Sequence, residues 1–215
     1  MEFSNFLFNG PKKSKHTIIL GHGAGAPMDS DFLNRFAMGL GEKNLRIVRF
    51  EFSYMKLIRS SGKKRPPNRL SILKTEWDNV IDYFKETNLI IGGKSMGGRI
   101  ASIVAAEREY CGFPLKGVIC LGYPFHPAGN SDKLRISHLE DMRTPMLICQ
   151  GERDNLGSRK EVETYTLSKS IKFHWLKDGD HSFKPRKASG LTTERNWQSG
   201  IDRIDKFVET LMNSN

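Results

Sequence analysis

The sequence predicts an α/β protein with a mostly parallel central sheet and helices on both faces. Short apolar segments typical of strands alternate with longer segments of helical periodicity. Most of the apolar segments are hydrophobic throughout, as in strands that are covered on both faces of a sheet. Several end in glycines and polar side chains, at the edge where such sheets bind ligands. A chain of 215 residues suits one domain, residues 1–215, with a substantial core.

The expected strands are the apolar segments, which cover residues 17–20, 45–52, 89–91, 118–121, 145–149 and 171–176. The expected helices have apolar residues three or four positions apart. These helices cover residues 32–40, 71–84, 99–106, 158–167 and 195–212. Residues 53–69 are polar and basic and contain Pro66-Pro67, so we expect them to be mostly loop.

The composition is that of a soluble globular protein, with 38% hydrophobic and 27% charged residues. No apolar stretch approaches the length of a membrane span. The first residues lack the basic and apolar regions of a secretory signal. The three cysteines, Cys111, Cys120 and Cys149, form no CxxC pair, and the last two fall in apolar strand-like segments. We therefore expect reduced, buried thiols in a cytoplasmic protein with no membrane partner.

The net charge of +10 is concentrated in two loops. Their basic residues are Lys56, Arg59, Lys63, Lys64, Arg65 and Arg69 in the first, and Lys184, Arg186, Lys187 and Arg195 in the second. Both loops should leave the sheet at its carboxyl edge, where they would attract an anionic small-molecule substrate. A solvated basic surface is the alternative. Because no nucleic-acid-binding motif accompanies the charge, a nucleic-acid partner is not expected, and nothing indicates an oligomeric state.

Residues 92–98, Gly-Gly-Lys-Ser-Met-Gly-Gly, have the layout of a nucleophile elbow. A strand precedes them and a helix follows. Glycines at 93 and 97 let the strand and helix approach closely, so that the hydroxyl of Ser95 is exposed above the sheet. The alternatives are a phosphate-binding P-loop and an ordinary glycine-rich turn. The P-loop motif requires a glycine where Asn88 stands, which argues against it.

A serine nucleophile needs a histidine base, and the base needs a carboxylate that orients it. His181 follows the strand 171–176 in a Gly-Asp-His turn, whereas His174 lies within that strand. We therefore expect His181 to be the base. Asp154 follows the strand 145–149 and is the expected acid, with Glu152 as its competitor. Asp178 and Asp180 are too close to His181 in the sequence to be preferred.

The oxyanion hole should use two backbone N–H groups. One is that of Met96, the residue after the nucleophile. The other comes from the glycine-rich segment after the first strand, where Ala24 is preferred over Gly23. An unremarkable glycine-rich turn is the alternative at that segment.

Together, His22-Gly23, the Gly-x-Ser-x-Gly of residues 93–97, Asp154 and Gly179-Asp180-His181 resemble the motifs of an α/β-hydrolase. The resemblance covers roughly residues 17–211, nearly the whole chain. Within the α/β-hydrolases, the chain most resembles the small dienelactone-hydrolase-like branch. Within that branch, it resembles the little-characterised family that includes the hydrolase-like domain of a histone-acetyltransferase complex subunit. The segments that carry this narrower likeness are residues 22–26, 65–67 and 92–99. Dienelactone hydrolase itself has a cysteine nucleophile, so Ser95 does not imply lactone specificity.

The resulting expectation is a minimal serine hydrolase without a lid domain, acting on a small carboxylic ester or thioester without metal or cofactor. The segment between Tyr123 and Pro145 is too short for a large lid. The candidates for substrate contact are His22, Phe125, His126 and Arg65. For Phe125 and His126, packing in the core or on the surface is an equal alternative. The competing function is a non-catalytic hydrolase-like scaffold that binds a partner through its basic face.

Overall fold

A computed structural model describes residues 6–14, 16–84 and 88–213. They form a seven-stranded sheet in the order β1-β3-β2-β4-β5-β6-β7. All neighbouring strands are parallel except β1 and β3, which pair antiparallel at one edge. The strands are β1 (Phe6–Asn9), β2 (Thr17–Gly21), β3 (Arg46–Phe50), β4 (Leu89–Lys94), β5 (Gly117–Leu121), β6 (Met146–Gly151) and β7 (Ile171–Leu176). The predicted fold class is confirmed.

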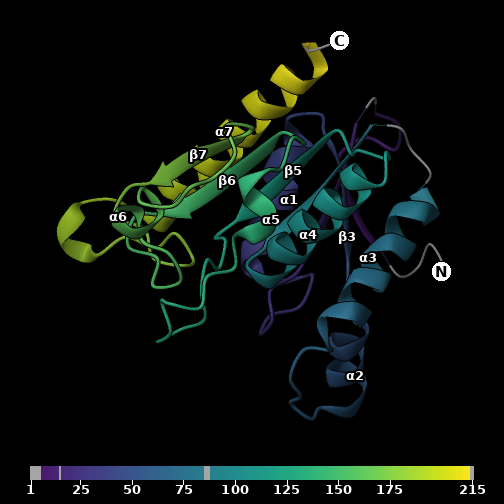
Figure 1. Cartoon of the computed structure of the whole chain (residues 1–215), viewed down its shortest axis with the longest axis horizontal. Coiled ribbons are helices and arrows are strands. Elements are labelled where there is room, and N and C mark those ends of the chain that lie inside the picture. The colour runs from purple at the N-terminus through teal and green to yellow at the C-terminus, as the bar shows by residue number, and fades with distance from the viewer. Residues whose placement is uncertain (1–5, 15, 85–87, 214–215) are drawn as a thin grey trace.

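Helices cover both faces of this sheet (Figure 1). They are α1 (Asp31–Glu42), α2 (Ser53–Ser61), α3 (Leu70–Phe84), α4 (Met96–Tyr110), α5 (Ser137–Glu140), α6 (Arg159–Val162), the 3₁₀ helix η2 (Lys187–Ser189) and α7 (Thr193–Asn213). Helices α1 and α7 pack against each other on one face, while α3 and α4 pack on the other. None of the helices in the described part of the chain combines the length and the apolar character needed to cross a membrane.

The two faces of the sheet have separate cores. In β2, Ile18 and Leu20 belong to the core beneath α1 and α7, whereas Ile19 belongs to the core beneath α3 and α4. Successive side chains of a strand point to opposite faces. Because both faces are covered, all three residues are apolar and at most 1% exposed. This explains why the strands appear in the sequence as continuous hydrophobic segments.

The structure differs from the sequence prediction in three elements. Residues 53–61 form helix α2, which buries Tyr54 and Met55 and ends at Gly62, a left-handed residue with φ 66°. The edge strand β1 was not predicted; its Phe6 is 5% exposed. The helix expected over residues 158–167 covers only Arg159–Val162, since only Val162 in it is buried. Residues 1–5, where we expect no secretory signal, lie outside the described residues.

Candidate active site

Ser95 lies at the turn between β4 and α4, in a backbone conformation that non-glycine residues rarely adopt. Its φ of 51° and ψ of −114° are strained. The flanking glycines let this turn contact the end of β2. A Cβ at Gly93 would lie 2.1 Å from the carbonyl oxygen of Gly21, and one at Gly97 would lie 2.4 Å from the same oxygen. The turn therefore has the geometry of a nucleophile elbow.

The structure brings Ser95, His181 and Asp154 together at the carboxyl ends of β4, β7 and β6. His181 Nε2 lies 2.9 Å from Ser95 Oγ, and His181 Nδ1 lies 2.7 Å from Asp154 Oδ2. An ionised carboxylate only accepts hydrogen bonds, so Nδ1 carries the hydrogen and Nε2 is free to accept the serine proton. The competing His174 is engaged elsewhere, since its Nε2 lies 2.9 Å from Ser199 Oγ.

A glutamine that sequence reasoning missed holds the buried acid in place. Asp154 is fully buried. Its Oδ1 accepts the N–H of Leu156, and its Oδ2 accepts the side-chain amide of Gln150, both at 2.9 Å. Gln150 is itself fully buried and is fixed by both backbone groups of Tyr123, at 2.7 and 3.1 Å. The only signal in the sequence was a polar amide at the end of the apolar strand β6, four residues before the acid.

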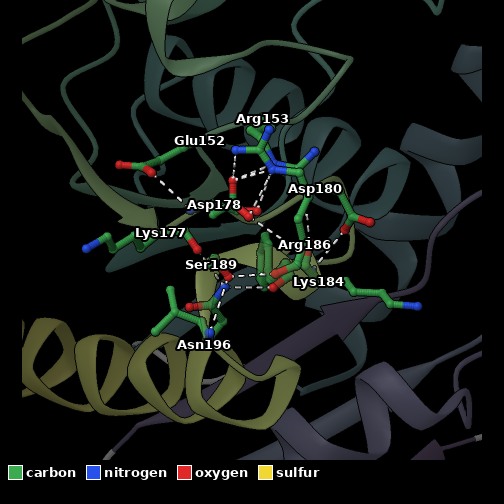
Figure 2. Close-up of polar contacts among 11 residues, drawn as sticks. Glu152, Arg153, Lys177, Asp178, Asp180, Lys184, Arg186, Ser189 and Asn196 are labelled. Atoms are coloured by element: carbon green, nitrogen blue, oxygen red, sulfur yellow. Dashed lines mark hydrogen bonds and ion pairs between the residues drawn. The ribbon is translucent and has the colours of Figure 1, made fainter.

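The other carboxylates near His181 stabilise loops instead (Figure 2). Glu152 accepts the backbone N–H of Asp178 at 2.9 Å. Asp178 is paired with Arg186 at 2.5 Å and with Arg153 at 2.9 Å, and the bonds from Arg186 lower the pKa of Asp178 to about 2. Asp180 accepts two backbone N–H groups of its own loop, at 2.8 and 3.0 Å. Within residues 6–14, 16–84 and 88–213, no group of three or more His, Cys, Asp or Glu side chains could hold a metal ion.

The segment after β2, residues 22–25, lies beside the nucleophile; we call it the oxyanion loop. A Cβ at Gly23 would lie 3.8 Å from the Cβ of Ser95. Met96 is the first residue of α4. The first N–H groups of a helix have no partner within it and carry partial positive charge. Both predicted oxyanion donors, the N–H groups of Met96 and Ala24, therefore lie on segments next to Ser95.

His22 binds the backbone of the oxyanion loop through its side chain and is not exposed toward a substrate. Its side chain is fully buried. Nε2 accepts the N–H of Phe52 at 3.1 Å, so Nδ1 is the donor to the carbonyl of Gly23, at 2.7 Å. The Tyr54 hydroxyl donates to the carbonyl of Ala24 at 2.9 Å, and burial lowers the pKa of His22. The prediction of substrate contact for His22 is wrong because both ring nitrogens bind backbone.

Two further predicted substrate contacts are also wrong. Phe125 is fully buried and packs against Tyr123 and Tyr165, with ring centroids 4.7 and 5.7 Å apart. His126 is 4% exposed, and its Nδ1 lies 2.9 Å from the carbonyl of Pro127. The side chains that follow β5 are directed into the core, which a strand end in a sequence does not reveal.

The basic loops are partly neutralised. Arg59 is bonded to Glu51 at 2.8 Å, and Arg186 is bonded to Asp178 at 2.5 Å. Arg65 is exposed in the loop after α2, which projects beyond the sheet in Figure 1. The positive charge at this end of the molecule is therefore smaller than the residue count implies.

Comparison with known proteins agrees with the fold. A family model described as an alpha/beta hydrolase domain matches residues 14–209. The chain is similar to an alpha-beta serine hydrolase homologue from Coxiella burnetii, with 19% identity, a TM-score of 0.63, and coverage of 98% of this chain and 91% of that chain. It is similar to Est1E from Butyrivibrio proteoclasticus, in a structure with bound ferulic acid, with 17% identity, a TM-score of 0.66, and coverage of 93% and 95%. It is also similar to a monoacylglycerol lipase from Paleococcus ferrophilus, with 13% identity, a TM-score of 0.65, and coverage of 94% and 98%. The chain belongs to the α/β-hydrolase family.

Proposed function

We propose that the protein is a serine hydrolase that cleaves a small carboxylic ester or thioester through an acyl-enzyme. The observation that carries this proposal is the chain of hydrogen bonds from Ser95 through His181 to Asp154, at 2.9 and 2.7 Å. The strained backbone of Ser95 supports it, since strain of this kind is retained where a side chain must be presented for a reaction.

The proposed reaction has two halves. His181 Nε2 takes the hydroxyl proton of Ser95 as Oγ attacks the carbonyl carbon, and the buried carboxylate of Asp154 stabilises the imidazolium. The tetrahedral intermediate collapses when His181 returns the proton to the departing alcohol or thiol, which leaves the acyl group on Ser95. His181 then takes a proton from water as the water oxygen attacks this ester and forms a second tetrahedral intermediate. When His181 returns that proton to Ser95 Oγ, the C–Oγ bond breaks, the acid leaves and the serine is restored.

The N–H groups of Met96 and Ala24 are the proposed oxyanion donors, with Gly23 as the alternative to Ala24. In a trans peptide the C=O and the N–H point in opposite directions. The carbonyl of Gly23 is directed toward His22, so the N–H of Ala24, in the same peptide group, points away from that ring. Loss of one such donor typically costs a hundredfold or more in rate.

We further propose that the substrate is small and anionic. The segment between β5 and β6 contains only the four-residue helix α5, which argues against a lid over a long acyl chain.

The preference for an anionic substrate rests on Arg99. One turn along α4 from the nucleophile, Arg99 lies near Arg135 and His138. Burial and the charge of Arg99 together lower the pKa of Arg135 and lower that of His138 to about 4. The Nε of Arg99 is buried without a hydrogen-bond partner among the described residues. A substrate carboxylate or phosphate would relieve this repulsion, and Arg99→Met should then slow an anionic ester more than its neutral counterpart.

The motifs of residues 22–26, 65–67 and 92–99 support membership of the dienelactone-hydrolase-like branch.

The cysteines bear on the cellular location. The thiols of Cys120 and Cys149 are free and buried, and burial raises the pKa of Cys149 to about 12. Unpaired thiols of this kind support a reducing, cytoplasmic location.

Labelling with a fluorophosphonate probe tests the proposed function. The wild type should be labelled, whereas Ser95→Ala and His181→Ala should not. Absence of label on the wild type, or equal label on Ser95→Ala, would overturn the proposal and favour a non-catalytic scaffold. A nitrophenyl ester series of increasing acyl length would then measure the size of the acyl pocket.

A further inference from the structure

Lys94, the last residue of β4, contacts three of the segments that build the candidate active site. Its Nζ donates a hydrogen bond to the carbonyl oxygen of His181 at 2.7 Å. Its Cγ would lie 3.6 Å from a Cβ built at Gly23, in the oxyanion loop. Because Ser95 is the next residue, the side chain of Lys94 links the nucleophile, the oxyanion loop and the base.

The ammonium of Lys94 lies among aromatic rings and forms no direct ion pair with any acidic side chain in the described part of the chain. It is 5.3 Å from the ring centroid of Phe32 and 5.8 Å from that of Phe183, within the range of a cation–π interaction. Asp154 and Asp180 act on it only at longer range, and burial lowers the pKa of Lys94 to about 8. Even a partly buried charge without an ion-pair partner costs free energy, and an apolar side chain of similar length would avoid that cost. The position therefore calls for an explanation other than stability.

The loop that carries His181 is strained at both ends. Asp178 and Phe183 are non-glycine residues with left-handed backbone, at φ 53° and 67°. The contacts in Figure 2 fix these ends; the side-chain amide of Asn196, for example, donates to the carbonyl of Phe183 at 2.8 Å. Between the two ends, Lys94 holds the carbonyl of His181 itself.

We propose that Lys94 is a positioning residue for the hydrolytic reaction, which fixes the backbone of His181 and thereby holds its imidazole at Ser95. This inference rests on the proposed function, because a positioned base matters only if Ser95 is the nucleophile. In the Gly-x-Ser-x-Gly motif the residue before the serine can be of any type. The proposal gives that residue, Lys94, a specific role.

Lys94 also lies close to the imidazole whose backbone it holds. A Cβ at Gly122 would lie 2.8 Å from Lys94 Nζ and 3.3 Å from His181 Cε1. The ring nitrogens themselves bind Ser95 and Asp154, so Lys94 acts on the position of the ring through the His181 carbonyl.

Kinetics of Lys94→Met, Lys94→Arg and a matched control test the proposal. The control is Lys177→Met. Lys177 lies in the same loop as His181, is exposed, and directs its ammonium away from the other side chains in Figure 2. For a nitrophenyl ester, Lys94→Met should lower kcat about 10- to 100-fold with little change in KM. Lys94→Arg keeps a cationic donor for the His181 carbonyl, so it should restore most of kcat. Lys177→Met should match the wild type.

NMR of the His181 ring gives a readout that does not depend on activity. The Nδ1–H signal, which reports the hydrogen bond to Asp154, should shift and broaden in Lys94→Met and stay unchanged in Lys177→Met. An unchanged signal, or a wild-type kcat, in Lys94→Met would overturn the role of Lys94. A wild type that shows this signal but neither hydrolyses esters nor takes a fluorophosphonate label would instead refute the proposed function.

Discussion

Replacing Lys94 by methionine should stabilise the protein while it impairs the reaction. Burial lowers the pKa of Lys94 from 10.5 to about 8. At 1.36 kcal/mol per pH unit, a fully charged Lys94 then costs the folded state at most about 3 kcal/mol at pH 7. Methionine removes this cost but also the hydrogen bond to His181, which is worth about 2 kcal/mol because its donor is charged. The expected net gain in the free energy of unfolding is therefore about 1 kcal/mol.

The pH dependence identifies the cause of that gain. Between pH 8 and 10.5 the unfolded chain keeps the Lys94 proton that the folded protein releases. The contribution of Lys94 to the free energy of unfolding of the wild type therefore rises with pH. The advantage of Lys94→Met should therefore be largest below pH 8 and shrink as the pH approaches 10.5. Urea unfolding of both proteins at pH 7 and 9.5 measures it, because the other titrating groups are common to both. A variant less stable than the wild type at pH 7, or a difference that does not change with pH, would refute this reasoning.

Three further changes test other parts of the account. Gln150→Met removes the amide that binds Asp154, so it should lower kcat by about tenfold and the free energy of unfolding by about 2 kcal/mol; an unchanged kcat in an ester assay would count against its positioning role. Gly93→Ala places a Cβ 2.1 Å from backbone and should cost more than about 3 kcal/mol in thermal unfolding. The matched control is Gly112→Ala, where φ is 85° and the added Cβ would meet no atom of the described residues within 4 Å apart from its chain neighbours; it should cost about 1 kcal/mol from backbone strain alone. Reversal of the exposed basic residues after α2 should slow acidic esters more than neutral esters of the same size; equal slowing would remove these residues from substrate attraction. The charge-reversal variant carries glutamate in place of Lys63, Lys64 and Arg65.

Much of the fold could be predicted because the strands are buried on both faces. Apolar segments indicate the number of parallel strands and their sequence along the chain, and the polar residues after them must then meet at one edge of the sheet. Ser95, Asp154 and His181 could be selected together for this reason, although they are far apart in the sequence. The prediction used only the ends of strands, whose relative positions the parallel sheet determines.

The remaining features depend on side-chain direction, which the sequence does not encode locally. His22, Phe125 and His126 stand at strand ends as the triad does, yet the structure directs all three inward. The role of Gln150 depends on the backbone of Tyr123, and that of Lys94 on a carbonyl 87 positions away. Helix α2 was missed because its exposed face is basic and polar, while only Tyr54 and Met55 are buried.

The most direct test of the account is whether an acyl group accumulates on Ser95. The protein would be mixed with nitrophenyl acetate, quenched with acid during turnover, digested, and analysed by mass spectrometry. We expect an acetylated peptide that contains Ser95 in the wild type, together with a burst of nitrophenol, and neither signal in Ser95→Ala. Acetylation confined to other residues, or the same burst from Ser95→Ala, would contradict the assignment of Ser95 as the nucleophile.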